Sequence, residues 1–338
     1  MKELVSGSVG RMDANECGML QLTSKGLYCP AGGFHIDPWG PVETAVVTHA
    51  HADHARSGMG HYVVSRSGES LLRKRVGAGI GATVPGFGER LRLGGVEVSL
   101  HPAGHILGSS QVRIAGPGGV TVVTGDHNAS HAHPAAEPFE VVPCDTLITE
   151  STFGMPVYTW PDPGVILEAI HGWWRGNREA GRTSILPCYP LGKTQRILAA
   201  LDPTVGPIAV AGPGRAFLPL YREAGVVLPE VLDLTAETVP VLKGEGLVLI
   251  SFAGQEPALL KRLQPLSYGA ASGWMRIRGF RRSRDFDRGF VLSDHSDWHG
   301  LLRCVRESGA RRIGVTHGQT EVFARYLREE EGLDSFAV

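Results

Sequence analysis

Three histidines and an aspartate lie within six residues, in the pattern His-x-His-x-Asp-His from His49 to His54. The apolar run 45–47 precedes them and predicts a strand that ends at the cluster. Alternation along an extended chain points His49 and His51 the same way, whereas the adjacent Asp53 and His54 cannot share that direction. Imidazoles and carboxylates are ligands that suit zinc. The cluster therefore predicts ligands for two metal ions; the alternatives are a polar loop with chance histidines or a single structural site.

Short β-rich runs bounded by turn residues recur through the first half of the chain and would position such a site. They cover residues 33–36, 44–48, 96–100, 120–124 and 146–149. The polar residues that come after them are Asp37, His49, Asp126 and Glu150, with His105 in the glycine-containing loop 102–105. Binding sites of α/β proteins tend to lie at such strand ends. We therefore expect these side chains to gather at one place.

The pattern changes at Trp160–Gly164, where two prolines flank an aspartate and indicate a boundary before a helix. Helices over about 164–180, 193–202 and 214–224 alternate with strands over 183–187, 207–211 and 247–252, which predicts a parallel sheet covered by helices. Runs at 289–293 and 312–316 resume the first pattern. We predict a first domain over 1–162, an insert over 163–288, and completion of the first domain by 289–338.

Composition is that of a globular protein, with 338 residues, 42% hydrophobic residues and a formal net charge of −1. The charge gives no global field for collecting a polyanion, so nucleic acid would have to bind local patches. Five cysteines without a Cys-x-x-Cys pair indicate neither a disulfide framework nor a thiolate zinc site. The sequence shows no membrane span or signal peptide, so we expect a cytoplasmic protein with no membrane partner.

Seven segments together resemble the metallo-β-lactamase fold, and specifically its β-CASP branch of nucleases. They are Ile36-Asp37, His49 to His54, Gly104-His105, Thr124-Gly125-Asp126, Glu150 before Ser151, Ser293-Asp294-His295-Ser296-Asp297 and Thr316-His317-Gly318. The segments 191–196 and 272–274 are also similar to recurring β-CASP segments. The resemblance implies an α/β fold: a metallo-β-lactamase αββα sandwich with an inserted β-CASP domain, a parallel sheet flanked by helices. Through 34–39, 273–279 and 292–295, the chain is most similar to bacterial ligase-associated DNA exonucleases.

The resemblance also implies the metal ligands. One zinc would be held by His49, His51 and His105, a second by Asp53, His54 and His317, with Asp126 bridging the two. Manganese is an alternative working metal. Two dications, partly neutralised by both aspartates and a bridging hydroxide, would keep a small positive charge that suits a phosphate anion. Zinc can bring the pKa of a bound water to about 7, so a hydroxide nucleophile exists at neutral pH.

The same resemblance implies that His295 is the general acid that protonates the leaving group. Glu150 would hold His295 and keep it protonated. The alternative is that His295 positions a phosphate oxygen. Asp37 is expected to orient a metal-bound histidine, or else to cap a turn. His317 resembles the RNA-processing members of the family more than the eukaryotic DNA-repair members, but the longer likeness to ligase-associated exonucleases favours DNA.

Substrate contacts are expected near the end of the insert. An arginine-rich stretch, Arg276, Arg278, Arg281, Arg282, Arg284 and Arg288, is opposed only by Asp285 and Asp287 and could neutralise phosphates, or be a solvated face. Trp274 could stack on a base or pack in the core. Ser272 and Gly273 could hold a terminal phosphate.

Two further patterns are set aside. Gly192-Lys193-Thr194 lacks the glycine that a phosphate-binding loop needs at position 187, where Pro187 stands. His131 and His133 lie in a Pro/Ala-rich loop without a following Asp-His pair, and are read as surface histidines.

The function expected from these residues is a metal-dependent nuclease that hydrolyses phosphodiesters of single-stranded DNA, or DNA with a free end, as an exonuclease in DNA repair. Association with a DNA ligase and a helicase is implied by the resemblance. The alternatives are a β-CASP ribonuclease in RNA processing, a scaffold that binds nucleic acid without cutting it, and a small-molecule metallohydrolase.

Overall fold

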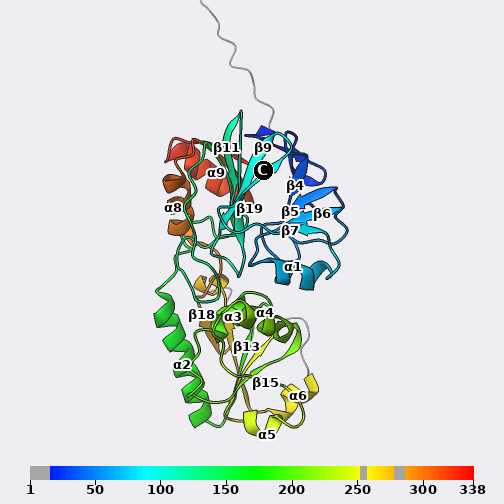
Figure 1. Ribbon diagram of the computed structural model, residues 1–338. Helices are drawn as coiled ribbons and strands as arrows, with labels where there is room; N and C mark the ends of the chain where they lie inside the picture. The colour runs from blue at the N-terminus through cyan, green and yellow to red at the C-terminus, as the bar shows by residue number, and fades with distance from the viewer. Residues whose placement is uncertain (1–15, 252–256, 278–285) are drawn as a thin grey trace, which may run out of the picture.

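The computed structural model describes residues 16–251, 257–277 and 286–338, which form two lobes (Figure 1). The first lobe contains two sheets, and the second lobe contains a third sheet. The α/β class expected from the sequence is confirmed. Among the described residues, no helix is both long and apolar enough to cross a membrane.

The first sheet has, within the described chain, seven strands in sequence order. They are β1 (Glu16–Cys17), β2 (Leu20–Thr23), β3 (Gly26–Cys29), β4 (Phe34–Ile36), β5 (Thr44–Val46), β6 (His61–Val63) and β7 (Ala82–Thr83). Strands β1 to β4 pair antiparallel, and β4 to β7 pair parallel. Because β4 and β5 run in the same direction, Asp37 and the His49 cluster leave the sheet at the same edge.

The second sheet, over the same described ranges, has the strand order β20-β19-β12-β11-β10-β9-β8. Its strands are β8 (Arg90–Leu93), β9 (Val96–Pro102), β10 (Ser110–Gly116), β11 (Gly119–Val123), β12 (Thr146–Ser151), β19 (Arg312–Gly318) and β20 (Asp334–Ala337). The parallel pair β12 and β19 joins residues far apart in the chain and places Glu150 opposite Thr316. Glu150 and His317 are therefore brought to the same end of the sheet.

The two sheets of the first lobe pack face to face. Their shared core includes Ile36 and Val46 from the first sheet and Val98, Val112 and Ile148 from the second. Helices cover the outer faces: α1 (Glu69–Val76) lies against the first sheet, and α8 (Trp298–Ser308) and α9 (Thr320–Glu329) lie against the second. The layers are thus helix, sheet, sheet, helix, and the loops at one edge of both sheets face the second lobe.

The second lobe is built on a parallel sheet whose described strands follow the order β15-β14-β16-β13-β17-β18. They are β13 (Thr183–Pro187), β14 (Ile208–Val210), β15 (Leu232–Asp233), β16 (Leu247–Ile250), β17 (Leu266–Ala271) and β18 (Arg288–Phe290). The helical elements are α2 (Pro163–Glu179), α3 (Lys193–Leu198), η1 (Gly212–Phe217), α4 (Leu218–Glu223), α5 (Val239–Leu242), α6 (Pro257–Arg262) and η2 (Gly273–Arg276). Separate apolar clusters on the two faces pack α2, α3, η1 and α4, and α5 and α6, against the sheet, while Met275 of η2 belongs to a third cluster.

Two helices of the second lobe differ from the sequence expectation. The helix expected over 193–202 ends at Leu198 and is followed by a turn at 199–200. Pro203 disfavours the helical conformation for Asp202, which excludes that residue from the helix. The helix expected over 214–224 begins as the 3-10 turn η1 and becomes α-helical at Leu218, with Pro219 in its first turn. Neither difference moves a candidate site residue.

Candidate metal centre

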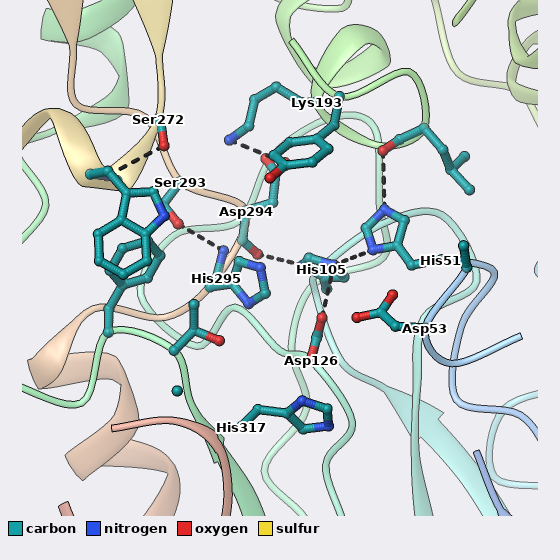
Figure 2. Close-up of a pocket in the computed structure, with 18 of the residues that line it drawn as sticks. His51, Asp53, His105, Asp126, Lys193, Ser272, Ser293, Asp294, His295 and His317 are labelled. Atoms are coloured by element: carbon teal, nitrogen blue, oxygen red, sulfur yellow. Dashed lines mark hydrogen bonds and ion pairs between the residues drawn. The ribbon is translucent and has the colours of Figure 1, made fainter. Parts of the chain in front are cut away.

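A cavity of about 550 Å³ lies between the two lobes and collects most of the candidate residues. Figure 2 shows His51, Asp53, His105, Asp126 and His317 on the side of the first lobe, with Lys193 and Ser272 facing them. Trp274, Gly273 and His295 also line the cavity. Side chains expected to bind metal and side chains expected to bind substrate therefore share one pocket.

Three imidazoles face one another at the base of this pocket. His51 Nδ1 lies 3.0 Å from His49 Nε2 and 3.1 Å from His105 Nε2. Asp126 Oδ2 is 3.6 Å from His49 Nε2 and 3.7 Å from His105 Nε2. Burial lowers the pKa of His49 and His51 and lowers that of His105 to about 3, so these rings are neutral at pH 7. Neutral imidazoles beside a carboxylate form the donor set that zinc prefers.

The outer nitrogens of the same three rings are held by oxygen atoms. His51 Nε2 lies 3.1 Å from the Leu191 carbonyl oxygen, and His105 Nδ1 lies 2.9 Å from that of Asp294. A carbonyl can only accept, so these two nitrogens carry the protons and the facing nitrogens keep their lone pairs. His49 Nδ1 is 3.1 Å from the Thr48 hydroxyl. The tautomers of His51 and His105 are thus those that a metal site needs.

A second half of the site surrounds His54. Asp37 Oδ2 accepts from His54 Nδ1 at 2.7 Å, and the Asp37 carboxylate also accepts from the backbone N–H and hydroxyl of Thr48 at 2.8 and 2.6 Å. The other ring nitrogen, His54 Nε2, is buried and has no hydrogen-bond partner within the described residues. It lies 3.5 Å from Asp126 Oδ1 and 3.7 Å from Asp53 Oδ2. A buried nitrogen aimed at two carboxylates fits a bound cation.

His54 is electrostatically linked to these carboxylates. Burial lowers the pKa of His54, but the carboxylates of Asp126 and Asp37 outweigh this effect and raise the pKa to about 10. The pKa of Asp126 is in turn held well below its usual range by His54 and His295, against the effect of burial. A divalent cation at this point would take the place of the proton on His54 Nε2, since metal ligands must be deprotonated.

His317 and Asp53 are less closely gathered. The His317 ring stacks on His54 with 5.2 Å between centroids, and Asp53 is exposed. In the described part of the chain, the compact groups of potential ligands are His49, His51, His105 and Asp126, and, separately, Asp126, Glu150 and His295. The three-histidine half is thus the better formed of the two. His317 and Asp37 have φ angles of 54° and 43°, a strained region for residues other than glycine.

His295 is paired with Glu150 beside Asp126, and its ring lies 4.5 Å from that of His105 between centroids. His295 Nδ1 lies 2.9 and 3.0 Å from the two Glu150 oxygens, and Glu150 is 1% exposed. Burial lowers the pKa of His295, but the carboxylates of Glu150 and Asp126 outweigh this effect and raise the pKa to about 9. The backbone N–H of His127 donates to Glu150 at 2.7 Å, and Trp160 Nε1 donates to the His295 carbonyl at 2.9 Å. A protonated imidazole is therefore fixed beside the candidate metal ligands.

Of the expected substrate residues, those that the structure describes lie at or near the pocket. Ser272 Oγ accepts from the Trp274 N–H at 3.3 Å at the start of η2, and the Trp274 ring packs 5.0 Å from that of Phe153. A Cβ on Gly273 would lie 2.5 Å from the same phenyl ring, so only glycine fits there. Arg276 is exposed and donates to the Val157 carbonyl at 3.3 Å.

Four of the arginines in the expected patch, Arg278, Arg281, Arg282 and Arg284, lie outside the described residues. The two histidines set aside at 131 and 133 are both partly exposed. The two ring nitrogens of His133 are nevertheless buried without a hydrogen-bond partner in the described chain, and His133 lies beside Arg196 and Leu292.

Sequence reasoning missed the contribution of the second lobe to the histidines. The Leu191 carbonyl reaches His51, and Lys193 and Arg196 contact the segment that carries His295. Contacts made by backbone carbonyls cannot be predicted from residue types, because every residue carries a carbonyl. The only signal was the family-like segment 191–196 itself.

Comparison with known proteins gives related nucleic-acid enzymes. No protein-family model matches the chain. It is 30% identical to a probable DNA ligase of Opitutus terrae over 317 residues, which cover 93% of this chain and 30% of that protein. It is 30% identical over 118 residues to the RNase aCSPSF2 of Saccharolobus solfataricus, covering 34% of this chain and 24% of that enzyme. An endoribonuclease ysh1 of Aspergillus fumigatus is 33% identical over 110 residues, with 32% and 12% covered.

This chain thus spans less than a third of the length of each of these relatives. Among solved structures, a protein of unknown function from Enterococcus faecalis V583 is similar in fold, with a TM-score of 0.57 and 15% identity. The likeness covers 87% of this chain and 78% of that one.

Proposed function

We propose that this chain is a two-metal nuclease that hydrolyses phosphodiester bonds of DNA from an end. The relatives support the metallo-β-lactamase and β-CASP nuclease family on which this proposal draws. One observation carries the proposal. Asp126 belongs both to the three-histidine group and to the group that contains Glu150 and His295. A candidate metal site and a protonated imidazole would therefore share one carboxylate, an arrangement that suits hydrolysis of a phosphodiester.

The residues would divide as follows. His49, His51 and His105 would hold one metal, and Asp53, His54 and His317 the second, with Asp126 shared between them. Zinc suits this imidazole-rich set, with manganese as an alternative. Two such ions, when bound, would supply a hydroxide nucleophile at neutral pH and offset the charge on the phosphate. Asp37 would orient His54 through their 2.7 Å hydrogen bond.

His295 would act on the leaving group. As the bond between phosphorus and the leaving oxygen breaks, the imidazolium would donate its proton to that oxygen, giving a free hydroxyl and a phosphomonoester. The Glu150 carboxylate, which lies within 3.0 Å of His295 Nδ1, leaves the other ring nitrogen as the donor. The neutral imidazole would then regain a proton from water.

The wall of the pocket opposite the candidate metal ligands would bind the DNA strand. Ser272 and Gly273 would hold a terminal phosphate, and Trp274, packed on Phe153, would offer a ring edge or face to a base. Arg276 and, by extension, Arg278, Arg281 and Arg282 would neutralise backbone phosphates. We propose the domain division 1–162, 163–288 and 289–338 for this arrangement, with the strand running between the lobes.

DNA is favoured as substrate because the relative that covers 93% of this chain is a probable DNA ligase. That likeness also supports a role in DNA repair in association with a ligase. A helicase is a further partner that the family resemblance implies. A ribonuclease is the second candidate, favoured by His317 and by the two ribonuclease relatives, which cover about a third of the chain.

Digestion of one sequence as DNA and as RNA, labelled separately at the 5′ and 3′ ends, tests the proposal. We expect stepwise shortening of single-stranded DNA with zinc or manganese, and no cleavage by Asp126→Ala. Asp334→Ala is the matched control, because its carboxylate is exposed and does not line the pocket. Faster cleavage of RNA would favour the ribonuclease. Tight binding of both polymers without cleavage under either metal would indicate a scaffold.

A further inference from the structure

The turn between β13 and α3 brings the second lobe into contact with the metal ligands. The Leu191 carbonyl oxygen lies 3.1 Å from His51 Nε2. This close approach depends on Gly192, whose φ is 89° and where a Cβ would lie 2.3 Å from Ile106, the neighbour of His105. Gln195 closes the turn by accepting from the Gly192 N–H at 2.7 Å and donating to the Pro190 carbonyl at 3.0 Å. The carbonyl that faces His51 is therefore rigidly placed.

Two buried cations of helix α3, which follows this turn, hold the segment before His295. Lys193 Nζ donates to the Leu292 carbonyl at 2.8 Å and lies 3.1 Å from Asp294 Oδ2. Arg196 Nη1 donates to Asp294 Oδ1 at 2.9 Å and also to the Ser293 carbonyl. Lys193 and Arg196 are each 4% exposed and Asp294 is 7% exposed, so water does not compete for these contacts.

The clamped segment reaches a metal ligand in turn. The Asp294 carbonyl accepts from His105 Nδ1 at 2.9 Å, so the backbone that Lys193 and Arg196 fix also fixes the tautomer and direction of His105. The other half of the site is held differently, since His54 is oriented by Asp37 and both belong to the first lobe. Within the three-histidine half, His49 also faces a first-lobe group, the Thr48 hydroxyl. The second lobe thus supports His51 and His105, and the first lobe supports His54.

We propose that Leu191, Lys193 and Arg196 are positioning residues of the three-histidine metal site, acting through the carbonyls of Leu191 and Asp294 on His51 and His105. The inference rests on the proposed function, since it assumes that this cluster binds metal. It assigns the Gly-Lys-Thr segment a structural role in metal binding in place of a phosphate-binding one. It also makes metal affinity at one half of the site depend on contact between the lobes.

Zinc binding to the metal-free protein, measured in competition with a chromophoric chelator, tests this directly. We expect two dissociation constants for the unsubstituted chain. Lys193→Met and Arg196→Met should each raise one of them by about 10 to 100-fold and leave the other within about threefold, the range seen when partners of metal ligands are removed. Asp37→Asn should raise the other constant instead.

The matched control is Arg178→Met. Arg178 also pairs with a carboxylate, Glu245, and donates to a backbone carbonyl, that of Val205, but entirely inside the second lobe. Both zinc constants should stay unchanged in this variant. If loss of a buried cation prevents folding, Arg196→Lys tests the positioning role instead. It keeps the positive charge but not the guanidinium group that reaches Ser293 and Asp294 together. It should raise the same constant by a smaller factor.

The outcomes separate the two proposals. If the unsubstituted chain binds two zinc ions and neither Lys193→Met nor Arg196→Lys changes either constant, the positioning role is wrong while the metal site stands. The same conclusion follows if Arg196→Met and Asp37→Asn raise one and the same constant. If the unsubstituted chain binds no zinc at the three-histidine cluster, the proposed function itself fails.

Discussion

The role of His295 can be tested by changing the leaving group. His295→Ala removes an imidazolium whose Nδ1 is held at 2.9 and 3.0 Å by Glu150, a carboxylate that is 1% exposed. General acid catalysis of this kind contributes about 100 to 10,000-fold in rate, or about 2.7 to 5.4 kcal/mol. We expect kcat on single-stranded DNA to fall by that factor.

A substrate that does not need the proton should escape this loss. Bis(p-nitrophenyl) phosphate releases p-nitrophenolate, which leaves as a stable anion at neutral pH. For this ester His295→Ala should lower kcat by less than about tenfold, since only general acid catalysis has been removed. Both substrates can be followed at equal metal loading, by product length for DNA and by absorbance for the ester.

The control for this comparison is His299→Ala, which removes an exposed histidine four residues away and should leave both activities unchanged. An equal loss of activity on both substrates in His295→Ala would refute the general acid role. It would show that His295 positions the phosphate, the alternative that the sequence left open.

Other predictions follow from single contacts. Glu150→Gln removes the charge that raises the pKa of His295, so the proton should be lost at lower pH and the alkaline fall of kcat against pH should move to lower pH than in the unsubstituted enzyme. Gly273→Ala places a Cβ 2.5 Å from Phe153 and should destabilise the fold by about 1 to 3 kcal/mol in thermal unfolding. Gly172→Ala, in helix α2, should instead stabilise it by up to about 1 kcal/mol, because the added Cβ would meet no described atom within 4 Å beyond its chain neighbours and its own helix backbone. Removal of metal with a chelator should lower Tm, because ligands that bind only the folded state stabilise it; an unchanged Tm would contradict metal binding.

The sequence was informative where residue type and strand position act together. His49, His105, Asp126 and Glu150 come at or after strand ends, and the structure brings all four to one pocket or its wall. Their chemistry was legible because imidazoles and carboxylates in this number are rarely needed for folding alone. The parallel sheet of the second lobe was also predicted, because its strands are short apolar runs that alternate with helices.

The supports of the site could not be predicted in the same way. The contact between His51 and Leu191 joins residues 140 positions apart through a backbone carbonyl, a group that every residue carries. Lys193 and Arg196 are residue types that, at the start of a helix, indicate exposure to solvent. They are buried against Asp294 only because the two lobes pack together. The burial of the His133 ring nitrogens likewise depends on how its loop packs, which local composition does not determine.

The central claim, that two metals gathered around Asp126 hydrolyse a phosphodiester, is tested most directly by refilling the metal-free protein. Zinc or manganese would be added in steps while bound metal and cleavage of an end-labelled single-stranded DNA are measured on the same sample. We predict that cleavage rises only as the second equivalent binds, and that Asp126→Ala binds the oligonucleotide but does not cut it. Cleavage that persists after complete metal removal, or that is undiminished in Asp126→Ala, would contradict the claim.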